Sequence, residues 1–268
     1  MSPNTYTTDH SSSVLRTHSW RTAANSAGYL LPHLRPEMTI LDVGCGPGSI
    51  SVDLAKRVPS GWVTGMEYVA DPLTQAREYA EAEGTQNTTF VTGDIHSLPF
   101  ADNTFDVVHV HQVLQHIADP VKALTEMRRV AKTDGLVVAR ESAHLTWSPS
   151  SEGLSKWWEL TVKMAREKGG NPHPGARIHE WASLAGFEMG RIQRSAGAWC
   201  FSTPEERRYW GGSMGERIKD SGFANKSVGE GFATHEELED MARAWRGWTE
   251  DESGWFGVLH GEMVCRKS

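Results

Sequence analysis

The chain has 268 residues and a formal net charge of −7 at pH 7, and this length suits one large domain with a full hydrophobic core. The acidic balance, without a run of Lys and Arg, disfavours nucleic acid as a partner, and no segment approaches the roughly 18 consecutive apolar residues of a membrane span. Three widely spaced cysteines give neither a disulfide framework nor metal-ligand spacing, and together with a polar N-terminus lacking a signal-peptide pattern they predict a cytoplasmic protein.

From residue 15 onwards, helical and strand patterns alternate along the chain. An amphipathic helix is expected over 15–34, because Leu30, Leu31 and Leu34 can face one side of it. Short apolar, β-branched runs predict strands at 38–43, 62–67, 88–92, 105–111 and 135–140. Helical spacing predicts helices at 49–58, 71–83 and 120–131. Such alternation is typical of βαβ units around a buried parallel sheet.

Beyond residue 140 the chain becomes polar and rich in tryptophan. We expect helices at 151–167, 175–184, 204–221 and 234–249, and a terminal pair of strands at 188–199 and 255–266. No repeat, low-complexity tract or long linker marks a second domain. The prediction is therefore an α/β fold with a doubly wound, mostly parallel seven-stranded sheet in a single domain over 1–268. Its parts are an N-terminal segment (1–35), a core (36–145) and helical cap insertions with the terminal strands (146–268).

The turn after the first strand is the most informative stretch, since residues 41–48 read Leu-Asp-Val-Gly-Cys-Gly-Pro-Gly. Gly44, Gly46 and Gly48 allow a sharp turn and a close approach of the backbone to a ligand, and the helix that follows offers unpaired N–H groups. This pattern predicts a nucleotide-cofactor loop. The dinucleotide fingerprint requires glycine or alanine where this chain has Ser49, so NAD and FAD are disfavoured.

These residues closely resemble the first motif of class I S-adenosylmethionine (SAM) methyltransferases, particularly the UbiE-like branch of small-molecule methyltransferases that is common in fungal secondary metabolism. The resemblance extends over roughly residues 15–200, and the gliotoxin-type dithiol S-methyltransferases are neighbours within that group. It implies a Rossmann-like fold and an enzyme that binds SAM and releases S-adenosylhomocysteine (SAH). Asp42, Cys45 and the three glycines would then contact the cofactor.

Ligands of open α/β sheets bind at the carboxyl ends of the strands. Glu67 ends the second strand, where a carboxylate can accept hydrogen bonds from both ribose hydroxyls, and the resemblance gives it this role. In the same way Tyr68 would lie along the adenine, Asp94 would face its exocyclic amine, and Ile95 would pack on the ring. The alternatives are a solvated glutamate and an aspartate that caps a turn.

The fourth strand runs into a segment rich in histidine and glutamine. The resemblance implies that His111 and Gln112 lie beside the sulfonium. For a phenol or a carbon acceptor, His111, His116 or Glu141 is a candidate catalytic base. His109 and His111 share one face of the strand, but no third ligand is indicated, so we expect no metal. A buried, hydrogen-bonded histidine is an equal interpretation of His116.

The N-terminal segment resembles the helix that UbiE-like enzymes fold over the cofactor as a lid. Arg21 would then pair with the methionine carboxylate, and Tyr6 or Trp20 would close the pocket. The alternative is a helix that is merely anchored to the core by its leucines, with Arg21 in solvent.

Nine of the eleven tryptophans follow residue 140. We interpret Trp157, Trp158 and Trp210 as the wall of an aromatic acceptor pocket, and we expect Trp181 and Trp255 in the core. The sequence motifs of DNA-base methyltransferases are missing after the fourth strand, which favours a small-molecule acceptor. A thiol or dithiol is favoured over a phenol or ring carbon, because no catalytic dyad is evident. O- or C-methylation of a phenol or quinone, and a non-catalytic SAM-binding regulator, remain open.

Overall fold

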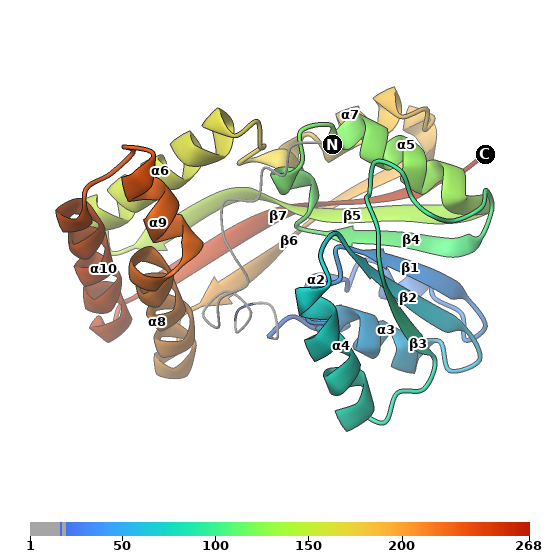
Figure 1. Ribbon diagram of the computed structural model, residues 1–268, viewed down its shortest axis with the longest axis horizontal. Coiled ribbons are helices and arrows are strands. Elements are labelled where there is room, and N and C mark those ends of the chain that lie inside the picture. The colour runs from blue at the N-terminus through green and yellow to red at the C-terminus, as the bar shows by residue number, and fades with distance from the viewer. Residues whose placement is uncertain (1–16, 18–19) are drawn as a thin grey trace.

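A seven-stranded sheet forms the centre of the computed structural model, which describes residue 17 and residues 20–268 (Figure 1). The strand order is β3-β2-β1-β4-β5-β7-β6. The strands are β1 (Thr39–Val43), β2 (Trp62–Glu67), β3 (Thr88–Thr92), β4 (Phe105–His111), β5 (Ala131–Ser148), β6 (Ile192–Phe201) and β7 (Trp255–Arg266). Strands β1 to β5 run parallel, and β7 is antiparallel to both of its neighbours. The strand order reverses between β1 and β4, and the predicted doubly wound sheet is confirmed.

Most strand bounds follow the apolar runs of the sequence, but β5 is much longer than predicted. It has 18 residues, whereas the apolar run covers only 135–140. Beyond Arg140 the strand alternates, with Leu145 and Trp147 packed under the cap while His144 and Thr146 are exposed. Only one face of the strand is covered there, so only every second residue is apolar, and the sequence shows no continuous apolar run. Strand β6 begins four residues later than predicted, because a 3-10 turn, η4 (Met189–Arg191), precedes it.

Helices cover both faces of the sheet (Figure 1). On one face lie α2 (Ala23–Ser26), α3 (Ser49–Arg57) and α4 (Asp71–Ala82), and on the other α5 (Pro120–Val130) and α7 (Ile178–Leu184). On α5, Leu124, Met127 and Val130 are fully buried against the sheet at helical spacing. Each such side chain contributes about 1.5–3 kcal/mol of burial free energy. Asp119 fixes the start of α5 by accepting a hydrogen bond from the Lys122 N–H at 2.9 Å.

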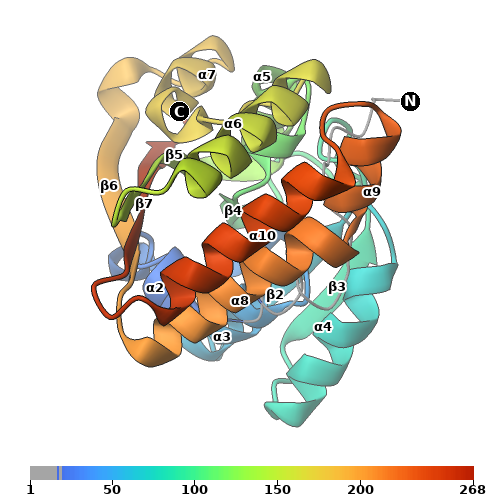
Figure 2. The same ribbon diagram turned by 90° about the vertical axis from the view of Figure 1, so that its left-hand side faces the viewer.

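Four further helices form a cap over the far ends of β5, β6 and β7 (Figures 1 and 2). They are α6 (Glu152–Glu167), α8 (Pro204–Asp220), α9 (Gly222–Gly229) and α10 (His235–Glu250). Thr203 and Thr234 start α8 and α10 with capping boxes. Trp245 is fully buried at the centre of the cap, with its ring 5.0 Å from that of Trp157. Helix α9 was not predicted, because a short segment bounded by Gly222 and Gly229 is typical of a loop.

The expected helix over 15–34 is wrong in the part that the structure describes. Between residues 20 and 34 only α2 and a 3-10 turn, η1 (Leu31–His33), are helical. Thr22 starts α2 through a capping box with Asn25. Pro32 lacks the N–H that a continuous helix would need, and it stands at the second residue of η1.

The two tryptophans assigned to the core differ in their exposure. Trp181 is 5% exposed, as predicted, whereas Trp255 is 40% exposed. Strand β7 turns alternate residues toward the cap, and these are Phe256 and Val258 rather than Trp255. Among the described residues, no helix is both long and apolar enough to cross a membrane.

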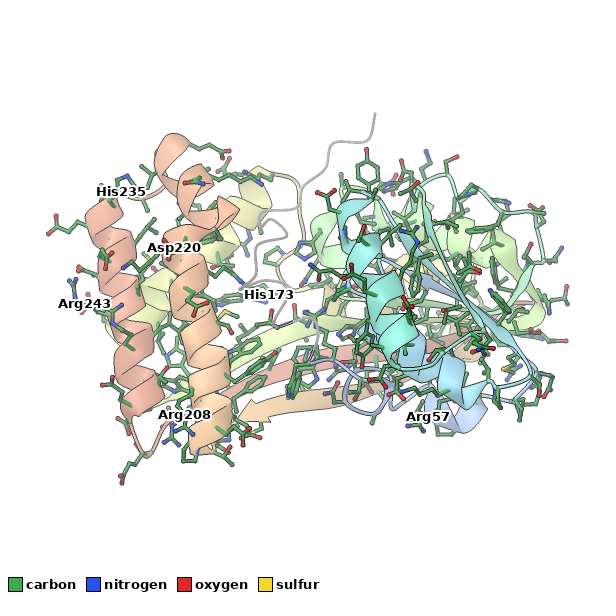
Figure 3. The ribbon with its side chains drawn as sticks, turned by 60° about the horizontal axis from the view of Figure 1, so that its bottom comes forward. Arg57, His173, Arg208, Asp220, His235 and Arg243 are labelled. Carbon is green, nitrogen blue, oxygen red and sulfur yellow. The ribbon has the colours of Figure 1, made fainter. Side chains whose placement is uncertain are left out.

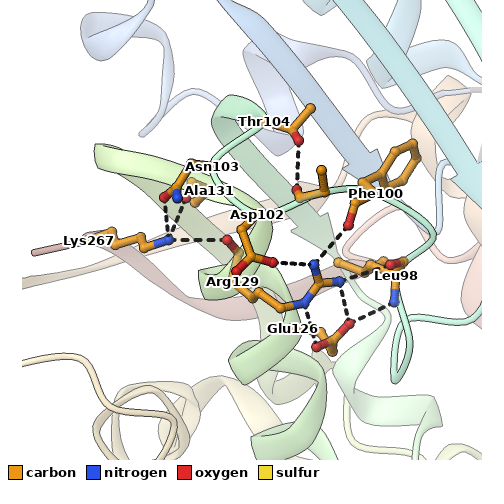
Figure 4. Close-up of polar contacts among 10 residues, drawn as sticks. Leu98, Phe100, Asp102, Asn103, Thr104, Glu126, Arg129, Ala131 and Lys267 are labelled. Atoms are coloured by element: carbon orange, nitrogen blue, oxygen red, sulfur yellow. Dashed lines mark hydrogen bonds and ion pairs between the residues drawn. The ribbon is translucent and has the colours of Figure 1, made fainter.

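A polar cluster around Arg129 of α5 secures the connection between β3 and β4 (Figure 4). Its guanidinium donates to the backbone oxygens of Leu98 at 2.9 Å and Phe100 at 2.8 Å. It also pairs with Asp102 and Glu126, both at 2.8 Å. These contacts lie at the amino ends of β4 and β5, so they fix the sheet from the end opposite to the carboxyl edge.

Candidate active site

A cavity of about 370 Å³ lies at the carboxyl edge of the sheet, where the strand ends meet the cap. Its walls come from the turn after β1, the ends of β2 and β4, the segment after β3, and helices α6 and α8. Most residues predicted for the site line this cavity, although they come from distant parts of the chain. They are Arg21, Asp42, Gly44, Cys45, Gly46, Glu67, Tyr68, Asp94, Ile95, His111, Gln112, His116, Trp157, Trp158 and Trp210.

Two predicted residues lie outside the lining, and Tyr6 lies outside the described residues. Gly48 is the left-handed N-cap of α3, and a Cβ there would stand 2.8 Å from the Cβ of Ala76. Helix packing therefore explains this glycine. Trp20 packs on Trp199 and Phe201, with ring centroids 5.3 Å apart in both pairs.

The glycine-rich turn is held between β2 and the segment that follows β4. Gly44 adopts a φ of +69°, and its N–H donates to the Met66 carbonyl at 2.7 Å. A Cβ on Gly44 would stand only 2.3 Å from Cγ2 of Val113. Glycine is thus required here both by the backbone conformation and by the close approach of Val113.

Glu67 and Asp42 are acidic residues with different environments. The Glu67 carboxylate accepts hydrogen bonds from the N–H groups of Gly46 at 2.9 Å and Tyr68 at 3.0 Å. These backbone donors hold it at the edge of the glycine loop. Asp42 is 2% exposed, accepts from the Ser51 hydroxyl, and lies 2.7 Å from Nδ1 of His109. Asp42 is therefore tied down beneath the loop.

The segment after β3 presents one carboxylate and one buried apolar side chain. Asp94 accepts from the His96 N–H at 2.8 Å, and its Oδ1 lies 2.9 Å from Nδ1 of the same ring. Burial opposes ionisation of Asp94, but these hydrogen bonds outweigh it and lower its pKa. Ile95 is 7% exposed, while Tyr68 is 51% exposed.

A network of polar side chains surrounds the end of β4. Arg21 donates to Oε1 of Gln112 at 2.9 Å, and Nε2 of Gln112 lies 2.9 Å from Nε2 of His260. Gln112 adopts a φ of +53°, which is uncommon for a residue of this type. Neither ring nitrogen of His111 has a hydrogen-bond partner among the described residues, although His111 is only 5% exposed. Within the same residues, no three His, Cys, Asp or Glu side chains are grouped to hold a metal ion.

His116 lies in the 3-10 turn η2 (Leu114–His116) that follows this network. Its Nε2 is 3.0 Å from Nε2 of Gln115, whose Oε1 accepts from the Ser142 hydroxyl at 2.9 Å. The Gln115 carbonyl accepts from the Asn171 N–H at 2.9 Å. The turn is thus tied to β5 on one side and to the segment after α6 on the other.

Three buried histidines at the cavity edge, His111, His116 and His260, have strongly lowered pKa values. Burial, followed by the charges of Arg21 and Arg217, lowers the pKa of His116 to about 3. Burial and the charges of Arg140 and Arg21 lower that of His260 to about 2. The pKa of His111 is also well below its usual value, mainly because of burial. Imidazoles of this kind are weak bases.

The cap contributes an aromatic wall. Trp157 and Trp158 lie on α6 and Trp210 on α8, where its ring stacks on that of Phe201 with centroids 4.3 Å apart. His173 lies between the cap and the sheet (Figure 3), with its ring 5.5 Å from that of Trp158. This half of the cavity is largely apolar, in contrast to the polar edge of the sheet.

Trp199 and Arg217 are among the lining residues that were not predicted from the sequence. Trp199 of β6 lies beneath two guanidinium groups, those of Arg140 at 4.9 Å and Arg21 at 5.5 Å, and its Nε1 donates to the Asn25 carbonyl at 2.7 Å. Arg217 of α8 donates to the Thr17 hydroxyl at 2.7 Å. Neither residue has a local sequence signal, because each reaches the cavity only through long-range packing.

Comparison with known proteins identifies the family. Residues 34–197 match the methyltransferase domain family, which is more than half of the chain. The chain belongs to this family. An uncharacterised methyltransferase of Schizosaccharomyces pombe is 37% identical over 266 residues, which cover 95% of this chain and 93% of that relative. A probable methyltransferase of Aspergillus luteorubrus is 31% identical over 278 residues, covering 98% of each chain.

Other similarities are shorter or concern the fold alone. A demethylmenaquinone methyltransferase of Anoxybacillus flavithermus is 41% identical over 40% of this chain and 45% of that relative. Among solved structures, the YcgJ protein of Bacillus subtilis has a TM-score of 0.58 at 16% identity, with 90% of this chain and 97% of that chain covered. The methyltransferase is therefore a class I enzyme that uses SAM as its methyl donor.

Proposed function

We propose that SAM lies along the carboxyl edge of the sheet and that a small-molecule acceptor enters from the cap. The observation that carries this proposal is the continuity of the cavity, which joins the glycine loop and Glu67 to the tryptophans of α6 and α8. A donor and an acceptor that share one cavity can meet without leaving protein contacts. The polar edge suits a nucleoside with an amino-acid tail, and the aromatic wall suits an apolar ring.

The carboxylate of Glu67 supports a ribose site at the end of β2. Two backbone N–H groups hold it at the loop edge, and a carboxylate has acceptor capacity for further donors. Asp94 and Ile95 then bind the adenine, the first by a hydrogen bond to the exocyclic amine and the second by packing. Tyr68 is exposed at the mouth, where it covers the ring on binding.

The methionine part of SAM is proposed to lie between the glycine loop and the end of β4. Arg21 supplies a positive charge for its carboxylate while keeping its hydrogen bond to Gln112. The unpartnered ring of His111 faces the same space and offers one donor and one acceptor as a neutral imidazole. Cys45, Gly44 and Gly46 provide the backbone surface on which the cofactor lies.

Methyl transfer needs little more than alignment, because the sulfonium is already activated. The enzyme holds an acceptor lone pair close to the methyl carbon and in line with the leaving sulfur, so that SAH departs as the new bond forms. The lowered pKa values of His111 and His116 argue against either as a general base, since efficient bases have a pKa near the working pH. Glu141 has a pKa of about 7, but it is fully buried and does not line the cavity, so it does not reach an acceptor there.

We therefore propose a thiol or dithiol acceptor, as in the gliotoxin-type S-methyltransferases of fungal secondary metabolism. A thiol with a pKa near 8.5 forms enough thiolate without a protein base, whereas a phenol with a pKa near 10 or a carbon acid does so less readily. Trp157, Trp158 and Trp210 would bind the apolar body of this acceptor.

We further propose that the chain forms one domain in which residues 1–35 act as a lid. The enzyme would act in the cytoplasm without a nucleic-acid or membrane partner.

Calorimetry with SAM tests the cofactor site directly. Replacing Glu67 by Ala should weaken SAM binding by about 1.5 to 3 kcal/mol, because the ribose hydroxyls lose a charged acceptor. Glu78→Ala, a change at an exposed position of α4, is the matched control and should leave the affinity unchanged. Equal affinities of the Glu67 variant and the unaltered protein would contradict the ribose assignment.

A pair of probes with one carbon skeleton tests the acceptor. With methyl-labelled SAM, 2-naphthalenethiol should be methylated and 2-naphthol should not, and the thiol rate should rise with pH until the thiol is ionised. His111→Gln and His116→Gln should each cost far less than the roughly 10²-fold minimum of general-base catalysis. Methylation of the naphthol with a large loss in either variant would instead indicate an O-methyltransferase with a histidine base.

A further inference from the structure

Two adjacent residues of β5 hold the turn that follows β4. Glu141 is fully buried, and its Oε1 accepts hydrogen bonds from the N–H groups of Val113 and Leu114, both at 2.8 Å. The next residue, Ser142, donates to Oε1 of Gln115 at 2.9 Å. Three hydrogen bonds therefore join the middle of β5 to the turn after β4, and this turn lines the cavity through Val113 and Gln115.

The position of this turn sets the shape of the proposed methionine site. Val113 packs so closely on Gly44 that only a glycine fits there. Gln112, one residue earlier, is held at a φ of +53° and accepts the hydrogen bond from Arg21. A shift of the turn would move the contact with the glycine loop and the anchor of Arg21 together.

We propose that Glu141 is a positioning residue for the cofactor and that its ionised carboxylate holds the turn in the conformation that binds SAM and SAH. The proposal rests on the cofactor location proposed above. Glu141 does not line the cavity, so it acts through the N–H groups of Val113 and Leu114. An ionised acceptor forms stronger hydrogen bonds with these donors than a neutral carboxyl group does.

The titration of Glu141 falls in the physiological range. Burial raises the pKa of Glu141, whereas the hydrogen bonds from the turn N–H groups and the charge of Arg21 lower it. Burial has the larger effect, and the pKa is about 7. Four buried titratable groups on the neighbouring elements have pKa values that are displaced away from this range. His111 on β4, His116 on the turn and His260 on β7 have strongly lowered pKa values, and Tyr29 has a strongly raised one.

The remaining charges near Glu141 form a pair on neighbouring strands. Arg140 and Glu262 are paired at 3.2 Å, and both occupy register positions that point away from the face of Glu141.

Because ionised Glu141 holds the conformation that binds the cofactor, thermodynamic linkage requires that SAH bind more tightly as Glu141 ionises. Binding near pH 7 must then release part of a proton.

Calorimetry of SAH binding between pH 5.5 and 8.5 tests the inference. The dissociation constant of the unaltered protein should rise roughly tenfold on acidification, with a midpoint near 7, as a charge-assisted hydrogen bond becomes a neutral one. Glu141→Gln should bind with an affinity that no longer depends on pH. His116→Gln should keep the pH dependence, because the imidazole is neutral throughout this range.

A second measurement uses the unaltered protein and does not depend on a variant that folds. Titrations at pH 7 in phosphate and in Tris, which have different ionisation enthalpies, should reveal proton release on SAH binding. An affinity independent of pH, an absence of proton release, or a pH dependence that survives in Glu141→Gln would each overturn the role of Glu141. An unaltered protein that does not bind SAH at pH 8 would instead refute the proposed cofactor site itself.

Discussion

The buried neutral histidines should make the protein sensitive to acid well above the pKa values of its carboxylates. His116 and His260 have folded-state pKa values of about 3 and about 2, compared with 6.5 in an unfolded chain. A group whose pKa is lowered by folding makes its full contribution to the free energy of unfolding at pH values above its pKa in the unfolded chain. That stability is lost as the pH falls, because the unfolded chain takes up protons that the folded protein does not.

The size of the effect follows from the two pKa values. At pH 5 a histidine of the unfolded chain is almost fully protonated, whereas each buried ring is not. Each buried histidine therefore lowers the free energy of unfolding by about 2 kcal/mol between pH 8 and pH 5. Glu141 acts in the opposite direction. Its folded-state pKa of about 7 lies above the usual 4.5, so at pH 8 the buried charge lowers the free energy of unfolding. As the pH falls to 5 the folded protein takes up this proton, and the free energy of unfolding rises by about 2.5 kcal/mol.

Urea unfolding at pH 8, 7, 6 and 5 separates these contributions. His116→Gln should reduce the loss of unfolding free energy between pH 8 and 5 by about 2 kcal/mol. His235→Gln, the same substitution at an exposed position on the cap (Figure 3), is the control variant. An equal loss of unfolding free energy on acidification in the His116 variant and the unaltered protein would contradict the destabilising effect of this buried imidazole.

Three further outcomes are expected. Gly44→Ala should lower the free energy of unfolding by about 1–2 kcal/mol because of its left-handed backbone, and it should also weaken SAM binding through the clash with the turn after β4. Gly84 has a similar φ of +66° with open space around it, so Gly84→Ala should leave SAM binding intact. Urea unfolding and calorimetry measure the two effects. Trp158→Leu should raise the KM for the acceptor with little change in the affinity for SAM, and an unchanged KM would remove this residue from the acceptor wall. Deletion of residues 1–21 should abolish turnover while the sheet stays folded by circular dichroism, and turnover at the full rate would contradict the lid.

The parts of the fold that were predicted correctly depend on local sequence. Strands 62–67, 88–92 and 105–111 have the predicted bounds, because each is a short run rich in apolar and β-branched residues. Strand 255–266 also has its predicted bounds. The places of the glycine loop and Glu67 at the carboxyl edge of the sheet could be predicted for a similar reason, since a turn and a strand end both leave local signals. The cavity brings them together as their positions at the strand ends suggested.

What was missed depends on contacts between distant segments. The second half of β5 is a strand only because the cap covers one of its faces, and Trp199 reaches the cavity only because β6 lies beside β7. The role of Glu141 rests on two hydrogen bonds to residues about 27 positions earlier. No periodicity records such a contact.

The most direct test of the account is to incubate the protein with methyl-labelled SAM and a metabolite extract and to follow the label by mass spectrometry. The label should appear in a small molecule as a thioether, SAH should form in equal amount, and Glu67→Ala should reduce both. SAM binding without label transfer to any component would contradict the proposed reaction and would indicate a protein that only binds the cofactor.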